Sequence, residues 1–279
     1  MSARPVAPKG ARTAVRPDGD SPVVAALLLE TRALSLRAAG RTLVDGLDWR
    51  VHAGERWCVV GRNGAGKSLV LRALAGLPVP GRAGEVRWQG RAQAEWPVGL
   101  AASVRALMPQ QAQDRFALTV ARVLALSQPP GVEGADAGAG SVAELLDALD
   151  IAHLAARRAD QLSGGERQRV ALAQCAVQGA ALMLLDEPVS FQDPAHQQRV
   201  GRWLADANGA GATAWTRGGA WIASAHDPSW IARVATHVLA LFGEGRWQAG
   251  TVEEILREDV LERTYGCPWR SVEGAWLPL

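Results

Sequence analysis

The sequence predicts an α/β protein organised around a phosphate-binding loop, and three observations carry this prediction. Residues 57–60 form a short apolar run typical of a buried strand, and residues 69–75 have the composition of a helix that Gly76 would cap. Between them, residues 61–68 match the pattern G-x-x-x-x-G-K-[ST] at every fixed position. Residues 181–185 are a second apolar run, as expected of a parallel strand buried on both faces.

The loop of residues 61–68 has the composition to hold a phosphate group. Its glycines allow consecutive backbone N–H groups to point at one anion, and the N-terminus of the next helix adds partial positive charge. We expect Lys67 to reach the β and γ phosphates of a nucleotide and the Ser68 hydroxyl to ligate Mg²⁺. The motif alone also fits a glycine-rich turn that opens a helix by chance. The predicted ATP-binding residues are Gly61, Arg62, Asn63, Gly64, Ala65, Gly66, Lys67, Ser68 and Leu69.

The composition is that of an ordinary globular protein with a substantial core: 279 residues, 48% hydrophobic and 21% charged. The net charge is +2, but residues 1–16 contain four cations and no acid, so the remainder is close to neutral. A near-neutral remainder argues against a nucleic-acid partner. The three cysteines are far apart and form no C-x-x-C pair, which favours a reducing cytoplasm over disulfides or zinc.

The N-terminal part of the chain predicts neither a membrane span nor a signal peptide. Its longest apolar run, residues 23–29, is too short to cross a bilayer and is expected to begin the first strand. Any membrane association would then come through a partner. Residues 1–22 are rich in Pro, Arg, Ala and Gly and are predicted to be a disordered extension, with one domain over residues 23–279.

Hydrophobic periodicity predicts the other elements, including a small helical subdomain at about residues 112–178 that contains a Gly/Ala-rich linker at 128–140. Residues 208–219 are expected to be a surface insert. Predicted strands lie at residues 27–36, 42–51, 84–88, 104–108, 221–225, 238–242 and 246–250, the first two as an antiparallel hairpin. Predicted helices lie at residues 118–126, 142–149, 163–178, 195–204 and within 252–261.

A second anion site is predicted at Ser163. Ser163 and Glu166 stand in the S-x-x-E spacing of a capping box, so a helix begins here with its first N–H groups partly free. The same capping box fits a well-capped structural helix equally well. The rest of the chain has to decide between these two interpretations.

Three titratable residues follow predicted strands. Asp186 and Glu187 come after residues 181–185 and would lie at the carboxyl end of a buried strand, where α/β sheets bind ligands. Asp186 suits Mg²⁺ coordination, and Glu187 suits orienting or deprotonating a water that attacks the γ phosphate. Without the phosphate loop, both also fit acids that end a strand in solvent. Taken alone, a histidine placed as His226 is, just before a helix cap, is more often a surface residue without a catalytic role than a catalytic group.

Taken together, these segments resemble the ATP-binding-cassette (ABC) ATPases over roughly residues 27–279. The matching motifs are the Walker A loop at 61–68, the Q-loop Gln110, the signature at 162–169, the Walker B strand at 182–187, the D-loop at 190–193 and the switch histidine His226. The signature Leu-Ser-Gly-Gly-Glu-Arg-Gln-Arg is highly specific in this order. The resemblance implies a P-loop NTPase fold of ABC type, with a mixed core sheet, an antiparallel β subdomain and an α-helical subdomain.

The resemblance also implies a homodimer that uses ATP and Mg²⁺. Two copies would pack head to tail, because one chain of this length holds a single phosphate loop. Each ATP would lie between the phosphate loop of one copy and the signature of the other. The residues implied to bind ATP in trans are Ser163, Gly164 and Gly165.

Further roles are carried over from the same resemblance. Gln110 would ligate Mg²⁺ and link the nucleotide to the helical subdomain, on which a membrane partner docks. His226 would contact the γ phosphate and position the water together with Glu187. The implied catalytic residues are Glu187, His226 and Gln110, and the implied metal ligands are Ser68, Gln110 and Asp186.

Two segments are similar to the ATPases of iron-siderophore, haem and cobalamin importers: residues 105–110, and the tail 260–268 with its Leu-x-x-x-Tyr-Gly element. This similarity implies a bacterial inner-membrane importer with two permease subunits, two ATPase subunits and, indirectly, a periplasmic binding protein. The chain would then be cytoplasmic and peripheral on the cytoplasmic face of the inner membrane. The alternatives are a soluble ABC ATPase acting as a regulatory or assembly switch, and an exporter subunit.

The chain departs from the family pattern near the base and after Ser68. The aromatic residue that usually stacks on adenine should fall near Arg37 or Ala38, so Arg37, Trp49 or Trp57 is expected to take its place. Leu69 stands where a threonine or serine often follows. The missing hydroxyl contact would cost about 0.5–1.5 kcal/mol of nucleotide binding.

Overall fold

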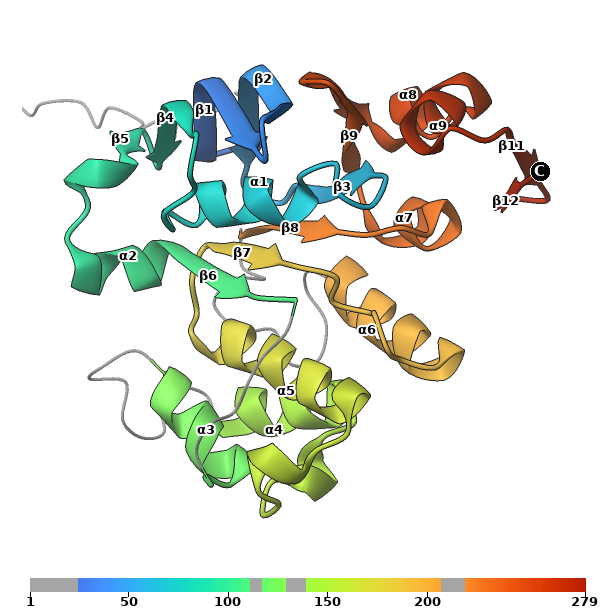
Figure 1. Ribbon diagram of the computed structural model, residues 1–279. Helices are drawn as coiled ribbons and strands as arrows, with labels where there is room; N and C mark the ends of the chain where they lie inside the picture. Colours follow the sequence, from blue (N-terminus) through green and yellow to red (C-terminus); the bar gives the residue numbers. More distant parts are fainter. Residues whose placement is uncertain (1–24, 111–116, 129–138, 207–218) are drawn as a thin grey trace, which may run out of the picture.

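The computed structural model describes residues 25–110, 117–128, 139–206 and 219–279 (Figure 1). They form an antiparallel sheet, a larger mixed sheet and helices on both sides of it, which confirms the predicted α/β class. The predicted extension at 1–22 and most of the predicted linker and insert lie outside the described residues. The domain boundaries and the helical subdomain at 112–178 stay predictions.

The antiparallel sheet confirms the predicted hairpin and extends it. Its strand order is β2-β1-β4-β5, with β1 (Leu27–Ala38), β2 (Arg41–His52), β4 (Ala83–Trp88) and β5 (Arg91–Ala92). β1 and β2 pair antiparallel along their length. Glu30 is buried on β1, and Arg32 and Arg50 pair with its carboxylate. Burial would raise the pKa of Glu30, but its bonds to these two arginines lower it.

The core sheet has the order β10-β9-β3-β8-β7-β6 and is parallel except for its edge strand β10. Its strands are β3 (Arg56–Gly61), β6 (Arg105–Met108), β7 (Leu182–Leu185), β8 (Ala220–Ser224), β9 (His237–Gly243) and β10 (Arg246–Thr251). Trp57 and Val59 of β3 face one apolar core, and Cys58 and Val60 face the other. Because both faces are covered, the central strands are almost continuously apolar.

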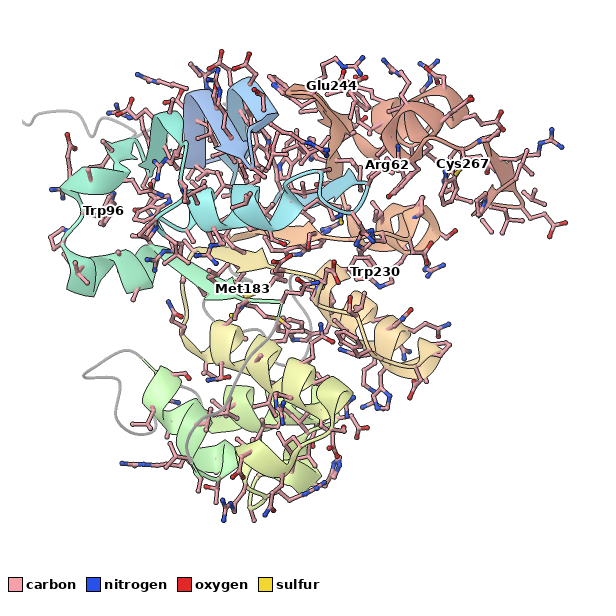
Figure 2. The ribbon with its side chains drawn as sticks, in the orientation of Figure 1. Arg62, Trp96, Met183, Trp230, Glu244 and Cys267 are labelled. Carbon is pink, nitrogen blue, oxygen red and sulfur yellow. The ribbon has the colours of Figure 1, made fainter. Side chains whose placement is uncertain are left out.

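Helices cover the two faces of the core sheet. Figure 1 shows α1 between the core sheet and the antiparallel sheet, and α3, α4 and α5 gathered beyond β6 and β7. Side chains such as Met183 and Trp230 fill the second core, on the face opposite α1 (Figure 2). The helices are α1 (Lys67–Leu74), α2 (Val98–Val104), α3 (Val120–Ser127), α4 (Ala139–Ala148), α5 (Gly164–Val177), α6 (Pro194–Ala205), α7 (Pro228–Val234), α8 (Val252–Ile255) and α9 (Glu258–Tyr265).

The parallel strands bring the candidate site together. The phosphate loop follows β3, Gln110 follows β6, Asp186 follows β7, and His226 follows β8. Since neighbouring parallel strands end at the same edge of a sheet, all four segments lie at one edge. Segments that are more than 160 residues apart in the chain therefore form one site.

Besides the two-residue strand β5, two elements are absent from the sequence prediction: helix α2 and the hairpin of β11 (Trp269–Val272) and β12 (Ala275–Pro278). α2 is short, contains Gly99 and leaves Val98 92% exposed, so it has little helical periodicity. Each strand of the hairpin has only four residues and is largely exposed. Neither element carries enough apolar pattern to be recognised from sequence.

Candidate active site

The phosphate loop joins the end of β3 to the start of α1, and its path requires glycine at two positions. Gly66 is the N-cap of α1 with a φ of 103°, which an L side chain rarely adopts. A Cβ atom on Gly61 would lie 2.9 Å from the carbonyl oxygen of Leu241. The loop therefore curves tightly and opens the N-terminus of α1, the arrangement that binds phosphate groups.

Lys67 lies inside this loop and is only 7% exposed. Its Nζ donates to the carbonyl oxygens of Gly61 at 2.9 Å and of Arg62 at 3.3 Å. Burial lowers the pKa of Lys67, and the carboxylates of Glu187 and Asp186 oppose that shift. A cation held beside the loop backbone is suited to pair with phosphate oxygens.

Asp186 is buried at the end of β7, and Ser224 of β8 holds it in place. The Ser224 hydroxyl donates to Asp186 Oδ1 at 2.7 Å and accepts from the backbone N–H of Glu187 at 2.8 Å. Ser224 has no exposed surface. One hydroxyl therefore fixes the orientation of the first carboxylate and the backbone of the second.

Glu187 faces the other polar groups of the site and has a left-handed backbone, with φ of 54°. Its Oε1 lies 3.0 Å from His226 Nε2, and its Oε2 accepts from the Ser190 hydroxyl at 2.8 Å. Burial would raise the pKa of Glu187, but hydrogen bonds from His226, Ser190 and Gln110 outweigh it and lower the pKa. Glu187 is therefore an ionised carboxylate, next to an imidazole, that can accept a proton from a water.

The Ser163 segment lines a cavity apart from the phosphate loop. Ser163 caps α5: its hydroxyl accepts from Glu166 N at 3.3 Å, and Glu166 Oε2 accepts from Ser163 N at 2.8 Å. With Gly164 and Gly165 it lines a cavity of about 660 Å³, and none of the described residues that line this cavity belongs to the phosphate loop. Gln168, also on α5, donates to the Glu187 carbonyl oxygen and so connects α5 to the end of β7.

A family model of ABC transporters matches residues 44–190, which include the phosphate loop, the Ser163 segment and the two carboxylates. The chain belongs to the ABC transporter family. Membership makes it an ATP-binding ATPase whose hydrolysis of ATP drives transport. Among the described residues, no helix is both long and apolar enough to cross a membrane.

Similar ABC proteins cover most of the chain. The hemin import ATP-binding protein HmuV of Streptomyces coelicolor is 38% identical over 245 residues, covering 87% of this chain and 84% of the relative. The HmuV protein of Pseudomonas aeruginosa is 36% identical, with coverage of 86% and 92%. A solved inward-facing structure of a metal-chelate type ABC transporter superposes with a TM-score of 0.71 at 23% identity, covering 91% of this chain and 98% of that chain.

The departures from the ABC pattern can be located in this fold. The prediction that Trp49 or Trp57 replaces the adenine-stacking aromatic is wrong, because both are buried, at 4% and 5% exposure. Their rings contact each other edge to face, and Trp57 also stacks on His237. Arg37 is exposed near the end of β1 and stays the candidate. Leu69 is partly buried and packs against the core.

Sequence reasoning did not single out Ser224. The signal that could have found it is a lone hydroxyl in the otherwise apolar run of residues 220–225. A buried hydroxyl requires hydrogen-bond partners, and the nearest polar groups at that edge of the sheet are the two carboxylate residues. The identity of the partner strand depends on sheet order, which the sequence alone leaves open.

Proposed function

We propose that this ABC ATPase supplies the energy for import of haem or a closely related metal chelate. The hemin import ATPases named above are similar over most of both chains. The tail of residues 260–268 supports the same assignment. For the hydrolytic step, the observation that carries the proposal is the ionised Glu187 held between His226 and Ser190, beside Lys67.

In this proposal, the γ phosphate of ATP binds to the backbone N–H groups of residues 61–68 and to Lys67. Glu187 accepts a hydrogen bond from the attacking water and takes its proton, and His226 orients Glu187 and the γ phosphate. Gln110 donates a hydrogen bond to Glu187. A change at the site would therefore be transmitted through Gln110 to the residues that follow it in the chain. Lys67 and the N-terminus of α1 stabilise the negative charge that develops on the leaving group.

The donor set at the loop fits a bound Mg²⁺. Ser68, Gln110 and Asp186 supply oxygen ligands, which Mg²⁺ prefers, and Asp186 is already oriented by Ser224. Mg²⁺, when bound, would neutralise charge on the β and γ phosphates. Asp186 is only 6% exposed, and Ser224 occupies one of its two carboxylate oxygens.

The proposal includes a homodimer in which each ATP is shared. Ser163, Gly164 and Gly165 lie in a cavity apart from the phosphate loop, which suits them to complete the site of a second copy. The dimer would dock on permease subunits at the cytoplasmic face of the membrane. A periplasmic binding protein would deliver the chelate to the permease and never touch this chain.

Glu187→Gln tests the hydrolytic assignment. Turnover should fall by about 100-fold or more because the general base is lost, while ATP binding persists. Glu253→Gln, an exposed change on α8, is the matched control and should leave turnover unchanged. ATP binding by calorimetry and phosphate release separate the two effects. Hydrolysis that continues at the normal rate in Glu187→Gln would overturn the assignment.

Growth on a single iron source tests the transported compound. A strain deleted for this chain should fail to grow with hemin as the only iron source and should recover with the native chain, not with Glu187→Gln. Growth on ferric siderophore and cobalamin uptake should be unaffected. Loss of either of those, with normal growth on hemin, would assign the importer to another chelate.

A further inference from the structure

The C-terminal segment, residues 258–279, lies against the loop that carries His226. Val260, Leu261 and Thr264 form the buried face of α9, which packs against β9 and β3. Figure 1 shows α9, β11 and β12 beside α7, the helix that starts two residues after His226. The segment therefore borders the site although its motif has no place in the chemistry described above.

Tyr265 makes the first contact. Its hydroxyl donates to the carbonyl oxygen of His226 at 3.2 Å. Burial raises the pKa of the Tyr265 phenol, so the hydroxyl keeps its proton and remains a donor. Its ring lies 5.2 Å from that of Trp269, at 43°, which restrains the side chain.

The hairpin makes a second contact, with Ser229 in the first turn of α7. The backbone N–H of Trp276 donates to Ser229 Oγ at 2.8 Å, and Ser229 Oγ donates to the Trp276 carbonyl oxygen at 3.4 Å. Ser229 lies in the first turn of α7, three residues after His226. The tail thus contacts both His226 and the first turn of α7 that follows it.

Gly266 brings the same tail against the phosphate loop. It ends α9 with a φ of 77°, and a Cβ atom there would lie 3.3 Å from Arg62 Nη1. Figure 2 labels Arg62 and Cys267, the residue that follows Gly266. Tyr265 therefore bonds the His226 loop, and the next residue, Gly266, lies close to the Arg62 side chain of the phosphate loop.

We propose that Tyr265 is a positioning residue for ATP hydrolysis, which fixes the His226 carbonyl and thereby keeps the imidazole directed at Glu187. The carbonyl is bonded to the Cα atom that carries the imidazole, so rotation of this peptide would displace the ring. The contact between His226 Nε2 and Glu187 Oε1 is 3.0 Å, and a shift of about 1 Å would break it. The inference rests on the proposed hydrolytic function.

Tyr265→Phe removes only the hydroxyl and tests the proposal. We expect kcat for ATP to fall about 3- to 10-fold, the size of one lost hydrogen bond, with KM changed less than about 2-fold. Thr264→Val is the matched control: it deletes a buried hydroxyl of the same helix, which donates to the Val260 carbonyl oxygen and not to the site. It should keep the native kcat.

A double mutant separates action through His226 from a general effect on the fold. In a His226→Ala background, Tyr265→Phe should cause no further loss of the residual rate, because its target is gone. A further loss there would overturn the proposal, as would native kcat in Tyr265→Phe or an equal loss in Thr264→Val. If the native chain hydrolyses no ATP, the proposed function fails instead.

Tyr265 is the only tyrosine of the chain, so a spectroscopic label on tyrosine reports on this position without mutating it to another amino acid. Chain labelled with 3-fluorotyrosine should give one ¹⁹F resonance. In the Glu187→Gln variant, adding ATP and Mg²⁺ should shift this resonance, and His226→Ala should abolish that shift. A resonance that ignores ATP, or responds equally without His226, would contradict the proposal.

Discussion

Ser224 is the residue on which the geometry of both carboxylates depends. It is entirely buried and bonds Asp186 and the backbone of Glu187 at once. Asp186 and Glu187 could be predicted as site residues because carboxylates after a buried strand are visible in sequence. Ser224 could not, since its role requires β8 to lie beside β7, and that order comes from packing of the whole sheet.

Ser224→Ala should lower the free energy of unfolding by about 1–3 kcal/mol, because it leaves a buried carboxylate oxygen and a buried N–H without their partner. Urea unfolding measures this change. Ser103→Ala, which alters an exposed hydroxyl on α2, should stay within about 0.5 kcal/mol of the native chain. Equal stability of the two variants would mean that the hydroxyl bridge contributes nothing.

Ser190 is one of the groups that lower the pKa of Glu187, so its loss should change the pH dependence of activity. Its hydroxyl donates to Glu187 Oε2, and this bond helps to lower the pKa of Glu187, which keeps the carboxylate ionised to lower pH. Ser190→Ala should raise that pKa, so ATPase activity should begin to fall at a higher pH on acidification. Ser35→Ala removes a similar bond, to Asp45 in the antiparallel sheet, and should leave the profile unchanged. An unchanged acid limb in Ser190→Ala would contradict this account.

At the scale of elements, most of the fold could be read from local pattern. Alternation predicted β1 and β2, and apolar runs predicted β3 and β7. α2 and the β11–β12 hairpin could not be predicted from the sequence because they are short and largely exposed. Trp49 and Trp57 were misassigned because an aromatic residue in a strand has the same pattern whether it faces a core or a nucleotide.

The start of α5 combines a structural and a proposed catalytic role in Ser163, and Ser163→Asp separates them. Aspartate caps a helix as well as serine, so the free energy of unfolding should change by less than about 0.5 kcal/mol. Its charge would oppose the γ phosphate, so ATPase activity should fall by about 100-fold or more.

Thr251→Asp is the matched control for Ser163→Asp. Thr251 and Glu254 form the same capping box at α8, away from the site. This variant should keep both native stability and native activity. Native ATPase activity in Ser163→Asp would show that Ser163 is a helix cap and nothing more.

At the scale of the whole molecule, the arrangement that matters is the separation of the phosphate loop from the cavity at Ser163, the two proposed anion sites. The motifs and their order could be found in the sequence; the phosphate loop, Gln110, Asp186 and His226 follow strands of the core sheet, whereas Ser163 begins helix α5. The sequence alone could not predict that the tail bonds His226 and Ser229, because these contacts join residues about 40 positions or more apart through side chains. The separation of the two sites is what makes a pair of chains necessary in the proposed mechanism.

Mixing two inactive variants measures this central claim most directly. Lys67→Ala destroys the phosphate loop, and Ser163→Asp destroys the signature, so each variant alone should hydrolyse almost no ATP. If every active site is built from two chains, a mixed dimer contains one site with native Lys67 and native Ser163, and the mixture should regain ATPase activity. A mixture no more active than its separate components would show that Lys67 and Ser163 do not act across a pair of chains.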